Sequence, residues 1–115
     1  MASFERFDVV RVPFPFTDRL AERVRPALVI SSRAAFNRPA GHSVMAMITS
    51  TGHAAWPLDV PIVDLKGAGL PAPSIVRFKL FTLDHRLVRG KLGQLGDKDR
   101  ANVQKVIRQL LLDGK

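Results

Sequence analysis

The sequence contains no cysteine, and this absence excludes disulfide bonds and metal sites built from thiolates. It also has no apolar run long enough to span a membrane. Residues 1–8 alternate between charged and apolar side chains, so we expect no secretory signal. Together these absences favour a protein of the reducing cytoplasm that makes no contact with a membrane.

The motifs of metal and nucleotide chemistry are absent as well. The three histidines, His42, His53 and His85, lie far apart in the sequence and form no HxxxH or HxH pair. There is no phosphate loop, no dinucleotide fingerprint and no serine nucleophile elbow. We therefore expect neither a metal ion nor another cofactor.

Positive charge, by contrast, is abundant. Eighteen Lys and Arg face ten Asp and Glu, which gives a formal net charge of +8 over 115 residues. Most of these cations are arginines, whose planar guanidinium binds phosphate in a way that lysine does not match. The balance favours a polyanionic partner, first a nucleic acid and second an acidic protein, although a basic and inert surface is the simpler alternative.

The hydrophobic pattern predicts several short strands followed by one helix. The length and the 46% hydrophobic content suit a single domain over residues 1–115 with its own core. Residues 97–112 place apolar side chains at helical spacing, and the segments 32–42, 50–57 and 66–73 are expected to be loops or turns. The predicted strands are residues 7–15, 26–31, 43–49, 58–63, 74–83 and 88–92. This order indicates a mainly β fold, a small barrel or curled sheet capped by a C-terminal helix.

Arginines and hydroxyl groups gather at the expected strand ends. Arg23 and Arg25 directly precede the predicted strand 26–31, and Thr49 and Ser50 stand at the end of another. RNA carries its own nucleophile, the ribose 2′-hydroxyl, so a ribonuclease needs only to hold the phosphate, neutralise developing charge and transfer protons. Arginine and a hydroxyl can do the first two. Taken alone, however, the residues favour the simpler interpretation of a solvated surface cation and a strand-end hydroxyl, since most surface charges are only solvated.

Five segments, FDVVRVPFPFTD, RVRPALVIS, MAMITS, GAGLPAPSIVRFKLFTLD and RLVRGKLGQL, followed by the helix, resemble the MazF/PemK toxins of type II toxin–antitoxin systems. The resemblance covers residues 4–112. It implies an SH3-like barrel that forms a homodimer and cuts single-stranded RNA without a metal, leaving a 2′,3′-cyclic phosphate and a 5′-hydroxyl. It also implies an antitoxin partner with an acidic, disordered tail, and a toxin–antitoxin complex that binds DNA.

The same resemblance assigns the catalytic residues. The arginine of the R-P-x-L-V-I motif falls on Arg25, and the threonine of the I-T-S motif falls on Thr49. A third arginine, used in the PemK branch, corresponds to Arg77, but Lys79 stands where that branch has an aspartate. The branch also uses a first-loop histidine, which this chain lacks, and Asp18 is an available acid there.

Besides Asp18, Arg23, Ser50 and Arg77, four further residues are secondary candidates for RNA binding, namely Lys79, Trp56, His53 and Arg86. Trp56 would either stack on a base or plug the barrel, and the usual burial of tryptophan favours the plug. His53 in the same loop titrates near neutral pH and could move a proton, although a solvated histidine is the simpler interpretation. Arg86 would widen a basic groove or belong to a solvated face. Whether Asp18, His53 or Arg77 takes part in proton transfer stays open.

Two other functions keep the same barrel. A CcdB-like toxin would bind DNA gyrase without cutting RNA, and a non-catalytic barrel would only bind nucleic acid. Cleavage of labelled RNA in the presence of EDTA separates both from the ribonuclease.

Overall fold

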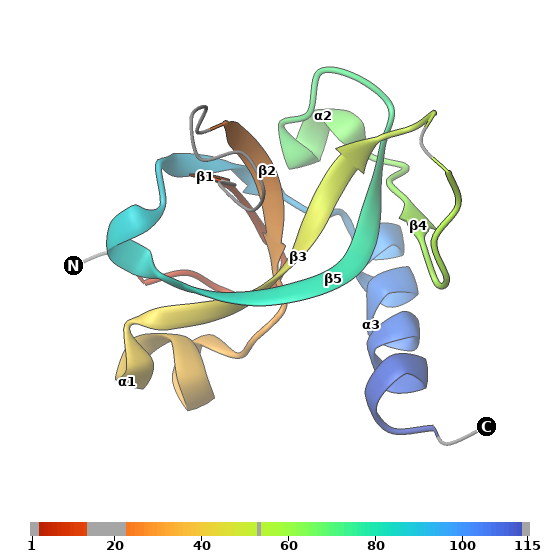
Figure 1. Ribbon diagram of the computed structural model, residues 1–115. Coiled ribbons are helices and arrows are strands. Elements are labelled where there is room, and N and C mark those ends of the chain that lie inside the picture. The colour runs from red at the N-terminus through yellow and green to blue at the C-terminus, as the bar shows by residue number, and fades with distance from the viewer. Residues whose placement is uncertain (1–2, 14–22, 53, 114–115) are drawn as a thin grey trace.

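A computed structural model describes residues 3–13, 23–52 and 54–113 and shows a curled antiparallel sheet with a helix beside it (Figure 1). In this part of the chain the strands run in the order β4-β5-β3-β2-β1-β6. They are β1 (Asp8–Pro13), β2 (Val24–Val29), β3 (His42–Ser50), β4 (Val60–Pro61), β5 (Ser74–Asp84) and β6 (Gly90–Gln94). The helical segments are η1 (Arg33–Asn37), α1 (Arg38–Ala40), α2 (Leu65–Ala68), η2 (His85–Leu87) and α3 (Asp97–Leu111).

Both faces of the central strands are buried, because alternate β-branched and apolar residues serve two different cores. Val9 and Leu28 belong to the core that α3 covers, whereas Val10, Ala27 and Val29 belong to a second core on the other face. The long strand β5 curls across the molecule and closes over this second core (Figure 1). A register shift in the β3–β5 pairing accompanies the curl.

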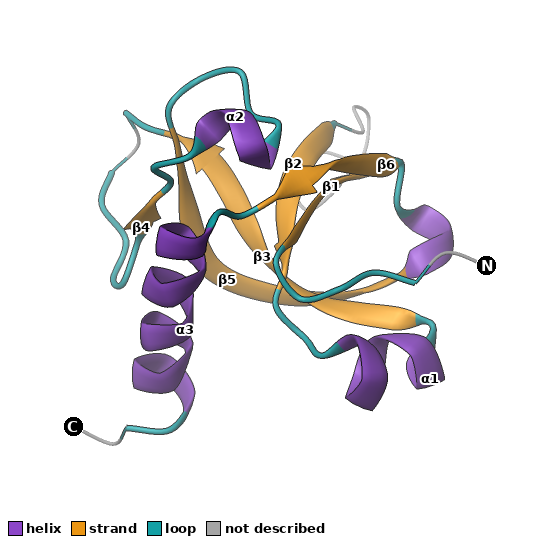
Figure 2. Ribbon diagram, turned by 180° about the vertical axis from the view of Figure 1, so that it is seen from behind, coloured by secondary structure: helices purple, strands orange, loops and turns teal. Residues whose placement is uncertain are grey.

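Helix α3 packs against one face of the sheet, beside β4 and below α2 (Figure 2). Its residue Val103 is fully buried in the first core. The buried carboxylate of Asp99 accepts hydrogen bonds from the backbone N–H groups of Val63 and Asp64, both at 2.9 Å. These bonds tie α3 to the chain just after β4. None of the helices in the described segments is long and apolar enough to cross a membrane.

The predicted mainly β fold with a C-terminal helix is confirmed, but some boundaries were wrong. Strand β2 begins at Val24, because Val24 and Arg25 still pair with Pro13 and Val12 of β1. Arg25 therefore lies inside β2 rather than before it. Thr49 lies within β3, as the predicted strand 43–49 had it, and β3 extends one residue further at each end. The Arg25 side chain is consequently held by a sheet and not by a loop, which fixes it more rigidly than expected.

Two short elements also differ from the prediction. The expected turn at 66–73 contains the single-turn helix α2, in which the Asp64 carboxylate caps the N–H of Gly67 and Gly69 ends the turn with φ +74°. A side chain at Gly69 would also meet the carbonyl oxygen of Leu92, so only glycine fits there. The predicted strand 58–63 shortens to β4, since Leu58 adopts a positive φ of 67°.

The last strand also starts later than the sequence indicated. The 3₁₀ turn η2 occupies His85–Leu87, and the N–H of Val88 closes that turn by bonding the His85 carbonyl. Val88 and Arg89 are therefore outside the sheet, and β6 begins at Gly90. The sequence could not show this boundary, because a single 3₁₀ turn has no periodicity of its own.

Candidate active site

A groove lies at one end of the sheet, where β2 and β5 begin and β3 ends. In Figure 1 these strand ends and α2 lie together at the top of the molecule. The groove has a volume of ≈ 480 Å³. Its lining comprises Arg23, Val24, Arg25, Pro26, Ile48, Thr49, Ser50, Leu70, Pro71, Ala72 and Ser74. Two cations and several hydroxyl groups thus share one hollow with an apolar wall.

Arg25 and Thr49 are brought together by the strand register. β2 and β3 are antiparallel, with Ala27 opposite Met47. Continuing this register by two residues places Arg25 opposite Thr49, with both side chains on the same face of the sheet. Pro26, which has no N–H to donate, stands where the ladder stops. Residues separated by more than twenty positions in sequence therefore meet across one pair of strands.

The other two predicted groove residues lie at its rim. Arg23 precedes β2 and is exposed, and Ser50 ends β3 and is exposed. Ser50 is paired in register with Ser74, the first residue of β5. Arg25 and Thr49 are half-buried by comparison.

A second cluster surrounds Trp56 in the loop between β3 and β4. The ring of Trp56 lies under two cations, with Nζ of Lys79 at 4.4 Å and Cζ of Arg77 at 6.0 Å from its centroid. Trp56 is 41% exposed. The expected hydrophobic plug is therefore wrong, because the indole lies over polar side chains at the surface and not in either core.

Arg77 is a buried member of this cluster and is engaged by Asp59. Its Nε and Nη2 donate to the Asp59 carboxylate at 3.2 and 2.9 Å, and Nη2 also donates to the carbonyl of Ala54 at 2.7 Å. The hydrogen bond to Asp59 raises the pKa of Arg77 above its ordinary value. Arg77 is thus a fixed cation that holds the loop, which sets it apart from the two groove arginines.

Arg77 of the Trp56 cluster lies on the same face of the sheet as the candidate residue Thr49. In the β3–β5 pairing Met47 is opposite Arg77 and Thr49 is opposite Ile75. Side chains that face each other in an antiparallel pair project to the same side. Thr49 and Arg77 therefore point to one face from neighbouring strands.

Arg86 is not part of either cluster. It donates to the Asp84 carboxylate, with the shortest N–O distance 2.7 Å, and its side chain is 89% exposed. These hydrogen bonds hold the pKa of Asp84 well below its ordinary value. Asp84 pairs with His42 at the start of β3, the end opposite Thr49. Arg86 is therefore remote from the groove and belongs to a solvated face, which was the simpler of the two alternatives for it.

Two predicted candidates, Asp18 and His53, lie outside the described residues. Within the described residues, no three His, Asp or Glu side chains gather in a way that could hold a metal ion. Sequence reasoning missed Asp59 and the wall of Leu70, Pro71 and Ala72. Nothing in the sequence marks Asp59, since its partner Arg77 is eighteen residues away.

A curled antiparallel sheet with a C-terminal helix and an arginine- and hydroxyl-lined groove at its strand ends defines a class of small basic β proteins suited to phosphate-containing ligands. The chain belongs to the PemK-like, MazF-like toxin family of type II toxin–antitoxin systems, whose family model matches residues 5–111. The family resemblance drawn from the sequence motifs is thereby confirmed. A search of curated proteins found no significant match.

Solved structures of MazF toxins share the fold. MazF from Deinococcus radiodurans is 25% identical, with a TM-score of 0.72 over 96% of this chain and 98% of that one. A MazE–MazF structure from the same organism is 23% identical, with a TM-score of 0.73 over 96% and 97% of the two chains. An endoribonuclease in complex with its cognate antitoxin, from a mycobacterial species, is 20% identical, with a TM-score of 0.72 over 96% and 95%.

Proposed function

We propose that the chain is a metal-independent endoribonuclease that cleaves single-stranded RNA in the groove of Arg25 and Thr49. The observation that carries the proposal is that Arg25 and Thr49, from the neighbouring antiparallel strands β2 and β3, line one groove. Proteins titled endoribonucleases are among the structures with this fold. The net charge of +8 suits a polyanionic substrate.

The reaction uses the nucleophile that RNA supplies. The 2′-oxygen attacks the phosphorus, the bond from phosphorus to the 5′-oxygen breaks, and the products are a 2′,3′-cyclic phosphate and a 5′-hydroxyl. Solvent water accepts the proton of the 2′-hydroxyl and supplies the proton that the 5′-oxygen gains, so the protons balance. The Arg25 guanidinium neutralises the charge that develops on the phosphate, and the Thr49 hydroxyl donates a hydrogen bond to a phosphate oxygen.

Arg23 and Ser50 at the rim would guide the strand into the groove. Arg23 offers a cation to a phosphate before the deeper site. Ser50 offers a hydroxyl beside Thr49. Both residues can contact the backbone of any RNA, so they contribute affinity and not sequence preference.

The partner that fits this toxin is an antitoxin with an acidic, disordered tail, expressed with it in the cytoplasm. MazE–MazF complexes and a mycobacterial endoribonuclease bound to its cognate antitoxin have the same fold. An acidic segment would bind the surface that binds RNA, because both are polyanions. The toxin would then be inactive while its partner covers the groove.

Purified protein incubated with labelled single-stranded RNA in EDTA tests the proposal. Cleavage is expected, because neither Arg25 nor Thr49 needs a metal. An intact RNA with lowered electrophoretic mobility would instead support a barrel that only binds nucleic acid. Arrest of DNA gyrase without RNA cleavage would support a CcdB-like toxin. Either of these results would contradict the proposal.

We also expect the chain to form a homodimer in solution. Leu110, Leu111 and Leu112 at the end of α3 are 40%, 60% and 76% exposed, which is unfavourable for a cluster of leucines in water. The sequence has two further large apolar side chains, Phe14 and Phe16, for which core and dimer contacts are the alternatives, and both lie outside the described residues. Light scattering at micromolar concentration should give twice the 12.7 kDa mass of the chain. A mass of one chain at that concentration would count against the dimer.

A further inference from the structure

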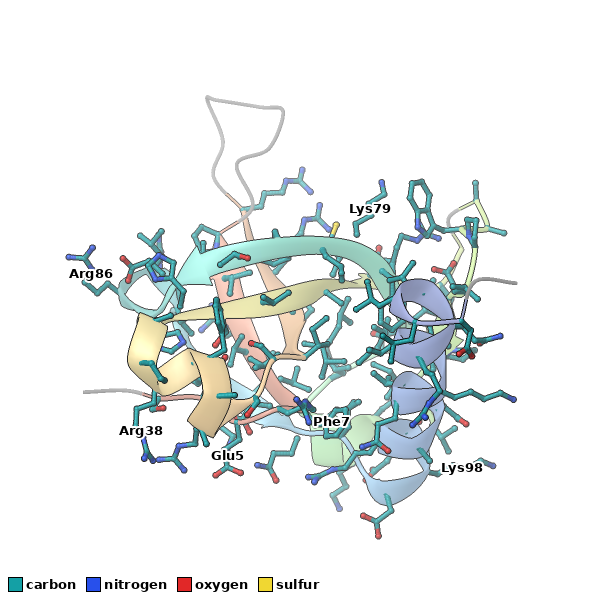
Figure 3. The ribbon with its side chains drawn as sticks, turned by 90° about the horizontal axis from the view of Figure 1, so that it is seen from below. Glu5, Phe7, Arg38, Lys79, Arg86 and Lys98 are labelled. Atoms are coloured by element: carbon teal, nitrogen blue, oxygen red, sulfur yellow. The ribbon has the colours of Figure 1, made fainter. Side chains whose placement is uncertain are left out.

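Trp56 is the only tryptophan of the chain, and it lies at the surface, where the residue is 41% exposed. Indole is large and apolar, so leaving it in water forgoes much of the stabilisation that burial would give. The ammonium of Lys79 lies 4.4 Å from the ring centroid. Figure 3 shows the Lys79 side chain projecting outward from β5. A ring and a cation are thus presented side by side to the solvent.

The loop that carries the ring is held by hydrogen bonds with the side chains of Asp59 and Arg77, which together we call the Arg77–Asp59 clamp. The Asp59 carboxylate accepts the backbone N–H of Trp56 at 3.1 Å, and the N–H of Asp59 donates to the carbonyl of Trp56 at 3.2 Å. The same carboxylate accepts two N–H groups of Arg77, whose Nη2 also holds the carbonyl of Ala54. The Arg77 and Asp59 side chains are only 11% and 17% exposed.

Burying the Arg77–Asp59 clamp costs free energy of desolvation, and neither hydrophobic core needs this ion pair for its packing. Taking a guanidinium and a carboxylate largely out of water is expensive, and a partly buried pair adds little net stability compared with apolar packing. The pair instead fixes the backbone on both sides of Trp56. The ring is therefore held in position before any ligand arrives, which lowers the entropy that binding must lose.

The position of the ring relates it to the groove. β5 lies between β3 and β4 in the sheet, and Arg77 projects to the same face as Thr49. The Trp56 ring rests against Arg77, so it stands on that face one strand beyond Thr49. Neighbouring strands are about 4.8 Å apart. An RNA strand crossing the groove over β2 and β3 reaches the ring if it continues across the sheet.

We infer that Trp56 and Lys79 form a subsite that stacks the base of a nucleotide neighbouring the scissile phosphate, with Lys79 binding the phosphate of that nucleotide. Aromatic rings that stack on bases, with cations that follow the backbone, are how proteins bind single strands. Arg77 and Asp59 are positioning residues that act through the loop. The inference rests on the proposed function, since a subsite has a role in cleavage only if RNA is the substrate.

Binding can be followed directly, because Trp56 is the sole tryptophan and its fluorescence reports the subsite alone. The ligand is a fully 2′-O-methylated single-stranded oligonucleotide, which binds but has no 2′-hydroxyl to attack. Quenching of Trp56 emission that saturates with the oligonucleotide is expected. If the oligonucleotide binds, as measured by its own anisotropy, and the emission does not change, the subsite is overturned while the proposed function survives.

Kinetics on cleavable RNA separate stacking from chemistry. Trp56→Ala is expected to raise KM by roughly ten- to a hundred-fold, the loss of one stacked base, with kcat within a few-fold of the parent. Trp56→Phe keeps a ring and should lie between the two. Phe36→Ala is the matched control, since Phe36 is a similarly exposed aromatic on η1 and should leave KM unchanged. An unchanged KM for Trp56→Ala overturns the inference.

Variants of Lys79 test the role of the cation, and a variant of Asp59 tests the role of the Arg77–Asp59 clamp. Lys79→Met is expected to raise KM and Lys79→Arg to restore it. Asp59→Asn should raise KM and shift the emission of Trp56 in the absence of any ligand, because the loop is no longer held. If Trp56→Ala instead converts a dimer into a monomer, as seen by light scattering, the ring is a contact between two copies and the subsite is overturned.

Discussion

Replacement of Arg25 by alanine should slow RNA cleavage by roughly a hundred- to a thousand-fold, the usual cost of losing a preorganised donor at a developing charge. The fold should persist, because Arg25 is half-buried at the start of β2 and its removal opens no cavity in either core. The effect should fall on the rate of the chemical step. Single-turnover cleavage of an end-labelled single-stranded RNA measures it, with thermal melting as the test of folding.

Two further variants show whether the guanidinium itself matters. Arg25→Lys is expected to rescue little, since an ammonium is a point charge and cannot form the bidentate fork. Arg38→Ala removes an exposed arginine from α1, away from the groove, and should cut at the parental rate. A near-parental rate for Arg25→Ala with an unchanged melting curve would remove Arg25 from the mechanism.

Thr49→Val is the second change with a large expected effect. Valine keeps the shape and the β-branched character that suit β3 and removes only the hydroxyl. The cleavage rate should fall by roughly a hundred-fold, because one hydrogen bond to the phosphate is lost where charge develops. Thr49→Ser keeps the hydroxyl and should retain most of the activity.

Thr82→Val provides the matched control for this variant. Thr82 lies on β5 opposite Val44 and is exposed, so the same change of side chain there should leave the rate unaltered. Single-turnover rates for the three variants, measured with the same RNA, give the comparison. Equal rates for Thr49→Val and Thr82→Val would show that the Thr49 hydroxyl takes no part in cleavage.

The fold could be predicted well where a hydrophobic pattern of strand or helix repeats over many residues. The strands β3 and β5 and the helix α3 all have enough residues for their alternation or helical spacing to be visible. The helix α2 could not be predicted in this way, because its single turn depends on the Asp64 cap and on Gly69. These are local hydrogen bonds and backbone angles, which hydrophobic patterns do not encode.

The candidate site could be predicted in part. Motifs marked Arg25 and Thr49, and their place near strand ends was visible in the sequence, but their meeting depends on the β2–β3 register. Register is set by long-range pairing and cannot be inferred from either segment alone. For the same reason the sequence did not show that Asp59 would engage Arg77, nor that this pair would hold Trp56 at the surface.

The identity of the cleaved ends tests the central claim most directly. Purified protein is incubated in EDTA with an end-labelled single-stranded RNA, and with the same RNA carrying one 2′-deoxyribose at the cleaved position. The account predicts cleavage of the first RNA to a 2′,3′-cyclic phosphate and a 5′-hydroxyl, and no cleavage of the second at that position. Products with 5′-phosphate ends, cleavage beside the deoxyribose, or activity lost in EDTA would contradict it.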